Sequence, residues 1–97
     1  MNTSQFDLAD RTAIVTGGGQ GIGRVICLAL AQAGSDVVVV DIDFDKAEAV
    51  AREAGELGRR SFAVQTDVCK RSQIEAMTHQ TLERFGKIDI LVNNAGG

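Results

Sequence analysis

The sequence predicts an α/β fold built on one doubly wound parallel sheet. Short apolar, β-branched runs alternate with longer stretches of helical periodicity, and only short joints separate them. A glycine-rich turn lies directly between the first apolar run and the first helical stretch. Because alternating strands and helices form parallel sheets with right-handed crossovers, we expect a Rossmann-type sheet of four strands in the order 3-2-1-4 with three helices. We expect residues 1–97 to form a single domain that is truncated after the fourth strand.

The first strand and the first helix enclose the glycine turn. Thr12–Thr16 is an apolar run that suits a strand buried on both faces. Five glycines fall between Gly17 and Gly23, and a helix that ends near Gly34 follows. A turn without Cβ atoms lets backbone N–H groups approach a phosphate, and the helix directs its unpaired N–H groups to the same place. The apolar stripe of this helix is expected at Ile22, Val25, Ile26, Ala29, Leu30 and Ala33.

The second strand and the second helix are predicted over residues 36–58. Four successive valines in Val37–Ile42 point to both faces, which favours a central strand. Asp43 or Asp45 is expected to cap the helix, and Asp45 with Glu48 has the spacing of a capping box. Gly58 ends the helix, whose apolar stripe is Ala47, Val50, Ala51, Ala54 and Leu57.

The last elements follow the same alternation. We expect a third strand over residues 61–66, a helix that starts between Cys69 and Ser72 and ends at Gly86, and a fourth strand at Ile88–Val92. Ser72 with Glu75 offers a capping box for the helix, and a cap at Cys69 is also possible. The first two helices should cover one face of the sheet and the third the other. The inner face of the third helix is expected at Ile74, Met77, Thr78, Thr81 and Phe85.

The glycine turn opens at the topological switch point, outside the carboxyl ends of strands one and four, where doubly wound sheets bind ligands. The dinucleotide pattern G-x-G-x-x-G fails in every register. The P-loop pattern also fails, because Arg24 and Val25 stand where Lys and Ser/Thr are required. The pattern that fits is Thr16-Gly17-x-x-x-Gly21-x-Gly23.

The other strand ends carry further polar groups. Asp41 ends strand two about 20 residues beyond the turn, where a carboxylate accepts the hydroxyls of an adenosine ribose. Asp67-Val68 closes strand three, and Asn93-Asn94-Ala95-Gly96 follows strand four.

Together these motifs make the whole chain resemble the cofactor-binding first half of the short-chain dehydrogenase/reductase family. The resemblance implies an NAD(P)-binding domain in which Gly19, Gln20 and Ile22 present backbone to the diphosphate. It also implies that Asp67 and Val68 hold the adenine and that the Asn-Asn-Ala-Gly segment lines the floor of the site. The residues implied to bind the cofactor are Gly17, Gly19, Gln20, Gly21, Ile22, Gly23, Asp41, Asp67, Val68, Asn94, Ala95 and Gly96.

The resemblance further implies an oxidoreductase that moves hydride between a nicotinamide cofactor and an alcohol or carbonyl substrate, with a homo-oligomeric intact protein. Asp41 would face the 2′-phosphate of NADP, so NAD is expected rather than NADP. The family's catalytic Ser and Tyr-x-x-x-Lys would lie downstream of Gly97, and the chain holds no Tyr, so no catalytic residue is assigned here and residues 1–97 alone are expected to be inactive.

Two alternatives remain open at this stage. The first is a nucleotide-binding module that has no catalytic half. The second, less favoured, is an S-adenosylmethionine-dependent methyltransferase, because Gly17, Gly19 and Gly21 also give G-x-G-x-G. That family usually has an acid where this chain has Val15, and it gives the Asn-Asn-Ala-Gly segment no role.

The composition of the chain limits which binding partners and which cellular compartment we expect for the protein. The net charge of −3 offers no basic surface for nucleic acid or an anionic membrane, and no stretch approaches the roughly 20 apolar residues of a membrane span. The first ten residues do not resemble a signal peptide, so a cytoplasmic protein is expected. Cys27, Cys69 and His79 do not form a metal-ligand pattern, so we expect no metal site.

Overall fold

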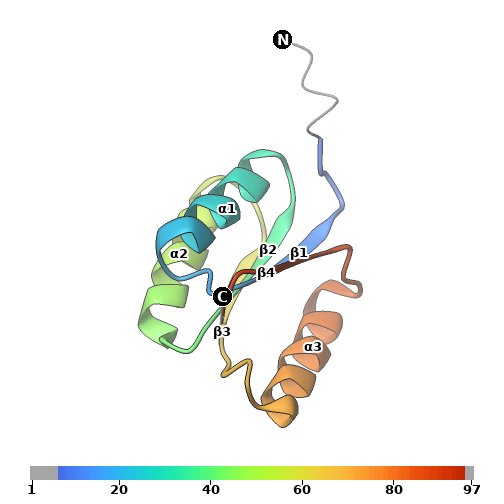
Figure 1. Ribbon diagram of the computed structural model, residues 1–97. Coiled ribbons are helices and arrows are strands. Elements are labelled where there is room, and N and C mark those ends of the chain that lie inside the picture. Colours follow the sequence, from blue (N-terminus) through green and yellow to red (C-terminus); the bar gives the residue numbers. More distant parts are fainter. Residues whose placement is uncertain (1–6, 96–97) are drawn as a thin grey trace.

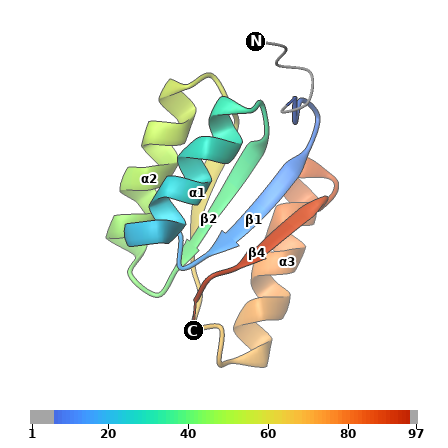
Figure 2. The same ribbon diagram turned by 45° about the horizontal axis from the view of Figure 1, so that its top comes forward.

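The computed structural model describes residues 7–95, in which strands and helices alternate along the chain (Figure 1). The strands form one parallel sheet in the order β3-β2-β1-β4. Helices α1 and α2 cover one face of this sheet and α3 covers the other (Figure 2). The predicted fold class is therefore confirmed. The elements are β1 (Thr12–Thr16), α1 (Gly21–Gln32), β2 (Asp36–Asp41), α2 (Phe44–Glu56), β3 (Ser61–Gln65), α3 (Arg71–Phe85) and β4 (Ile90–Asn93).

The core is built on the two central strands, β1 and β2. All four valines of β2 have no exposed surface, and burying each such side chain contributes roughly 1.5–3 kcal/mol. Val37 and Val39 pack under α1 and α2, whereas Val38 and Val40 face the α3 side. The alternation of side chains along a strand thus gives each face of the sheet its own apolar cluster. On the α3 side this cluster comprises Ile14, Val38, Val40, Phe62, Val64 and Met77.

Both predicted capping boxes are wrong, although the helices begin where expected. Asp43 caps α2 and accepts a hydrogen bond from the backbone N–H of Lys46. Asp45 therefore lies inside the first turn, and Glu48 pairs with Arg52 instead. The second box, at Ser72 and Glu75, fails for the same reason.

In α3, Lys70 occupies the N-cap position, without a side-chain cap. Its carbonyl accepts hydrogen bonds from the N–H groups of Gln73 and Ile74. Ser72 thus already lies within the helix, and Glu75 lies 3.4 Å from Arg71 in an i,i+4 ion pair. Gly86 ends this helix in the left-handed conformation, as predicted.

The buried face of α1 differs from the predicted stripe. Ile22 and Val25 are 72% and 61% exposed, and the buried residues of the helix are Gly23, Cys27 and Ala31. The reason is the close approach at Gly23, where an added Cβ would lie only 1.9 Å from the carbonyl oxygen of Gly17. The helix rests its small residues on the turn and the sheet, and this rotation carries Ile22 and Val25 outward.

The outer strand β4 begins later than predicted. It pairs with β1 over Ile90–Asn93, and Ile88 lies before it, packed against the α3-side cluster. Within residues 7–95, no strand lies on the other side of β4, and Leu91 is 64% exposed. In the same part of the chain, no helix has the length and apolar character needed to cross a membrane.

Candidate functional site

The glycine turn joins β1 to α1 at the carboxyl edge of the sheet. Gly17 and Gly21 have φ angles of 64° and 58°, a region that strongly favours glycine. The N–H of Gly18 donates to the carbonyl of Val40, which ties the turn to the end of β2. The turn is therefore held in a conformation that other residues would strain.

The first turn of α1 is suited to an anion. Gln20 occupies the N-cap position but makes no side-chain cap, and no acidic residue lies in the first turn. The N–H groups at the start of a helix lack intrahelical partners and carry the positive end of its dipole. Backbone donors and a positive dipole end thus meet beside the glycines, as a diphosphate site requires.

Asp41 lies at the end of β2 with its carboxylate against this turn. The residue is 8% exposed, and its Oδ2 accepts a 3.0 Å hydrogen bond from the N–H of Gly19. Its Oδ1 accepts a 3.0 Å hydrogen bond from the N–H of Asp43. Because a carboxylate offers about four acceptor positions, these two bonds fix its orientation and leave acceptor capacity for a ligand hydroxyl.

Asp67 and Val68 lie at the end of β3, beside Asp41. Oδ1 of Asp67 accepts from the N–H of Cys69 at 2.9 Å, and its own N–H donates to Oε1 of Gln73 at 2.8 Å. The loop is therefore held from within and from α3. A cavity of about 220 Å³ is lined by Gly17, Asp41, Ile42, Thr66, Asp67, Val68, Cys69 and Ala95.

The segment after β4 is fastened to the same turn through Thr16. The Thr16 hydroxyl oxygen accepts hydrogen bonds from the N–H groups of Asn94 (3.0 Å) and Ala95 (3.2 Å). The side-chain amide of Asn94 donates to the carbonyl of Gly17 at 3.3 Å. The segment thus closes one side of the cavity. The remaining residue predicted for the site, Gly96, lies outside the described residues.

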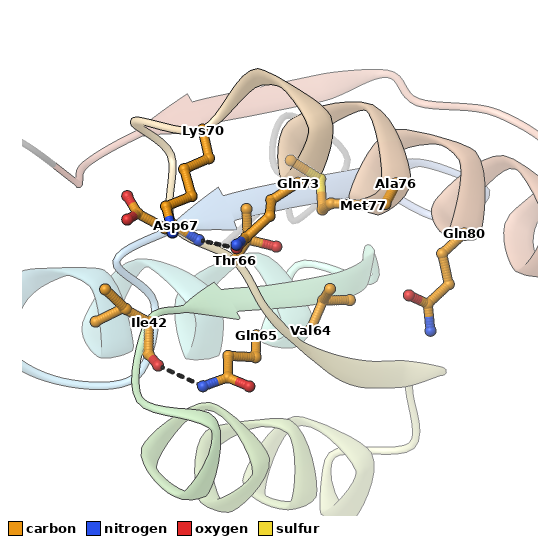
Figure 3. Close-up of a pocket in the computed structure, with 10 residues that line it drawn as sticks. All are labelled: Ile42, Val64, Gln65, Thr66, Asp67, Lys70, Gln73, Ala76, Met77 and Gln80. Atoms are coloured by element: carbon orange, nitrogen blue, oxygen red, sulfur yellow. Dashed lines mark hydrogen bonds between the residues drawn. The ribbon is translucent and has the colours of Figure 1, made fainter.

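A second, larger cavity adjoins the first, between the end of β3 and α3 (Figure 3). It measures about 460 Å³ and shares Ile42, Thr66 and Asp67 with the smaller one. Gln65 crosses its rim to donate to the carbonyl of Ile42 at 3.1 Å. Asp41 and Gly17, the first glycine of the turn, line the smaller cavity and not this one, so the carboxylate that suits a ribose belongs to the smaller cavity.

The structure adds three residues that the sequence reasoning missed as parts of the site: Thr16, Lys46 and Gln73. Nζ of Lys46 donates to Oε1 of Gln20 at 2.6 Å. Only Thr16 had a visible signal, its position directly before the first glycine. The contacts of Lys46 and Gln73 depend on how α2 and α3 sit against the turn, which no local pattern records.

Neither of the remaining titratable candidates contributes to this site. His79 lies exposed on α3, 3.5 Å from Glu83. Cys27 is buried behind the turn, with its thiol 3.9 Å from the carbonyl of Gly18, and burial raises its pKa to about 12. Within residues 7–95, no group of three His, Cys, Asp or Glu side chains could hold a metal ion. The arrangement is built for binding, with backbone donors, two carboxylates and a cavity between them.

Comparison with known proteins agrees with this geometry. The chain is 42% identical to the 7alpha-hydroxysteroid dehydrogenase of Escherichia coli K12 over 97 residues, which cover all of this chain and 38% of that protein. It is 44% identical over 88 residues to a 3-oxoacyl-(acyl-carrier-protein) reductase of Staphylococcus epidermidis, covering 90% of this chain and 36% of the reductase. The chain therefore spans less than half the length of these relatives.

A solved structure extends the likeness to three dimensions. A 7 alpha-hydroxysteroid dehydrogenase complexed with NADH and 7-oxo glycochenodeoxycholic acid is similar with a TM-score of 0.94 and 41% identity. The similarity covers all of this chain and 38% of that one. Residues 11–97 match the family described as short chain dehydrogenase. The chain belongs to the short-chain dehydrogenase/reductase family and corresponds to the N-terminal portion of its members.

Proposed function

We propose that this chain is the NAD-binding N-terminal part of an oxidoreductase that transfers hydride between a nicotinamide cofactor and an alcohol or carbonyl substrate. The observation that carries the proposal is the convergence of Asp41, Asp67 and Gly17, the first glycine of the turn, on one cavity at the carboxyl edge of the sheet. Family membership supports the same function and makes a methyltransferase, or a nucleotide-binding module that has no catalytic half, the weaker interpretation.

The described residues fit a dinucleotide. Nothing lies within 4 Å of a Cβ placed on Gly21, so the turn is open to a ligand at the start of α1. We assign the diphosphate to this turn, where Gly17, Gly21 and Gly23 keep side chains away. The backbone N–H groups of Gln20 and Ile22 would donate to the diphosphate oxygens, whereas the N–H of Gly19 already donates to Asp41.

The adenosine would lie across the neighbouring strand ends. Asp41 would accept the ribose hydroxyls, Asp67 and Val68 would contact the adenine, and Asn94, Ala95 and Gly96 would line the floor. When bound, the nicotinamide supplies or accepts the hydride. The chain's own residues position the cofactor for that step.

We further propose NAD rather than NADP as the cofactor. Asp41 places a carboxylate, held by two backbone N–H groups, where the 2′-phosphate of NADP would lie. Like charges brought together in a partly buried site cost several kcal/mol. Arg24 does not offset this charge, because it forms two hydrogen bonds with Glu53, at 3.0 and 2.5 Å.

The proposal for the intact protein extends beyond these residues. We infer a single NAD(P)-binding domain to which residues 1–97 contribute the first half, and catalytic Ser, Tyr and Lys residues downstream. The relative solved with NADH and a bile-acid ketone supports a small alcohol or carbonyl substrate. We also propose that the intact protein is a homo-oligomeric enzyme of the cytoplasm.

Cys69 allows a test of the cofactor position that does not depend on activity. It is exposed and lines the proposed adenine cavity, whereas Cys27 is buried with a pKa raised to about 12. Saturating NADH should therefore slow alkylation of Cys69 by N-ethylmaleimide several-fold, while Cys27 stays unmodified with or without NADH. The measurement is peptide mass spectrometry over a time course. An unchanged Cys69 rate at concentrations where titration shows NADH to be bound would place the adenine elsewhere.

A further inference from the structure

Lys46 brings an ammonium group to the glycine turn, next to Asp41. A Cβ built on Gly19 would lie 2.9 Å from Cβ of Lys46 and 2.8 Å from Oδ2 of Asp41, so the two side chains flank the same glycine. The Lys46 side chain then extends along the turn, where Nζ donates to Oε1 of Gln20 at 2.6 Å. Its backbone is fixed by the N-cap bond to Asp43.

The charge of Lys46 has no carboxylate partner in the described part of the chain. None of the ion pairs among residues 7–95 involves it, and its hydrogen-bond acceptor, the amide of Gln20, is neutral. The other cation at the turn, Arg24, is paired with Glu53. A cation in the first turn of a helix also opposes the helix dipole, so the stability of α2 does not account for Lys46.

We propose, resting on the function proposed above, that Lys46 is a specificity-determining residue that binds a 2′-phosphate once the charge of Asp41 is removed. The ribose 2′-hydroxyl is assigned to Asp41, and a cation close to that position is what accommodates a 2′-phosphate in related folds. The hydrogen bond between Lys46 and Gln20 is exposed to solvent, and its acceptor, the Gln20 amide, carries no charge. A phosphate is the stronger acceptor and would draw the ammonium away from the amide.

It follows that Asp41 alone excludes NADP from a site that otherwise has a cation to bind the 2′-phosphate.

The test uses the longest form of the protein that carries residues 1–97, with Asp41→Asn as the background. Asparagine removes the charge and keeps one oxygen that can accept from the N–H of Gly19, while its amide nitrogen cannot accept from the N–H of Asp43 as the second carboxylate oxygen does. Four proteins are compared in this background: Asp41→Asn alone, and with Lys46→Ala, Lys46→Arg or Arg52→Ala. Arg52 is the matched control, because it is an exposed cation of the same helix that pairs with Glu48 away from the turn.

Dissociation constants are measured for NADPH and NADH by fluorescence titration. Adenosine 2′,5′-bisphosphate and ADP are measured by calorimetry as probes of the adenosine subsite. Asp41→Asn should strengthen NADPH binding by about tenfold. Adding Lys46→Ala to Asp41→Asn should weaken NADPH binding again by about tenfold, and this second substitution should change NADH binding little. Lys46→Arg should restore NADPH binding, and Arg52→Ala should leave both constants unchanged.

Two results would overturn the inference while leaving the proposed function intact. One is an equal loss for NADH and NADPH in the Lys46→Ala variant, which would place Lys46 at the diphosphate. The other is that Lys46→Ala causes no loss of NADPH binding in the Asp41→Asn background. If the unsubstituted protein bound neither dinucleotide nor ADP, the cofactor site itself would be wrong, and the role of Lys46 would fall with it.

Discussion

Gly23 occupies the tightest contact in the site, where α1 meets the glycine turn. A Cβ at this position would lie 1.9 Å from the carbonyl oxygen of Gly17 and 2.7 Å from its carbonyl carbon, and a backbone cannot yield as a flexible side chain does. In the intact protein, Gly23→Val should therefore displace the helix from the turn and abolish NADH binding, which titration would show. The thermal unfolding midpoint should fall as well.

Gly55 is the matched control, because it also lies in a helix but has room around it. The nearest atom to an added Cβ there is Oγ of Ser61, at 3.6 Å. Gly55→Ala should leave NADH binding unchanged and stabilise the protein by about 0.5–1 kcal/mol, measured by denaturant unfolding. If both variants bound NADH alike, the diphosphate would not lie at this turn.

At the level of residues, sequence reasoning found the groups that lie at strand ends. Asp41, Asp67, Val68 and Ala95 line one cavity, as expected from the ends of parallel strands meeting at one edge. Lys46 was missed because its part in the site comes from the position of α2 against Gly19, a contact between elements. A periodic pattern predicts where a strand ends along the sequence, but it does not predict in which direction a long side chain such as Lys46 extends.

Among the elements, β1 and β4 are joined at their amino ends by Asp89. Its Oδ2 accepts from the N–H of Thr12 at 2.9 Å, and Lys87 and Arg11 lie 3.3 and 3.7 Å from the carboxylate. The Thr12 N–H, followed by the two cations, lowers the pKa of Asp89 below its ordinary value of 3.8. A lowered pKa in the folded state contributes stability above the ordinary pKa, and that contribution is lost as the pH falls through the folded pKa.

Asp89→Asn should therefore destabilise the protein by a constant amount at about pH 5 to 8, and the gap to the unsubstituted protein should shrink below about pH 4. Urea unfolding of both proteins across this pH range measures the difference in their free energies of unfolding. Glu75→Gln is the control, because Glu75 forms only an exposed pair with Arg71 on α3. A stability gap that persisted undiminished to the lowest pH would show that the charge of Asp89 does not carry the effect.

The order of the elements could be predicted more accurately than the faces of the helices. Four valines in a row and glycines after each helix specify where strands and helices lie. The buried face of α1 could not be read in the same way, because apolar spacing gives Ile22 and Val25 the same weight as Cys27. The contact of Gly23 with Gly17 decided the rotation, and that contact exists only after the turn has formed.

For the molecule as a whole, the outer edge of β4 determines how residues 1–97 should behave alone. Leu91 is 64% exposed, and within residues 7–95 β4 pairs only with β1. An open apolar strand edge pairs readily with other chains. A protein of residues 1–97 should therefore self-associate. Because these residues contain no Tyr and only part of the proposed cofactor-binding domain, it should also show no dehydrogenase activity and bind NAD weakly at best. Light scattering, calorimetry and a dehydrogenase assay measure the three properties. A monomer with cooperative unfolding and micromolar NAD affinity would favour a stand-alone nucleotide-binding module instead.

The hydrogen bonds that Asn94 donates to Thr16 and Gly17 also determine when the cavity can form during synthesis of the chain. The two ends of the Asn94–Gly17 hydrogen bond are separated by 77 positions in the sequence. At about 5–20 residues per second, a ribosome needs roughly 4 to 15 s to add the segment between them. Once β2 has been synthesised within that interval, the glycine turn can form beside it, but the wall of the cavity that Asn94 and Ala95 provide does not yet exist. A cofactor that binds against this wall can therefore do so only after β4 has left the ribosome and paired with β1, so it can stabilise the assembled sheet but cannot template its first strands.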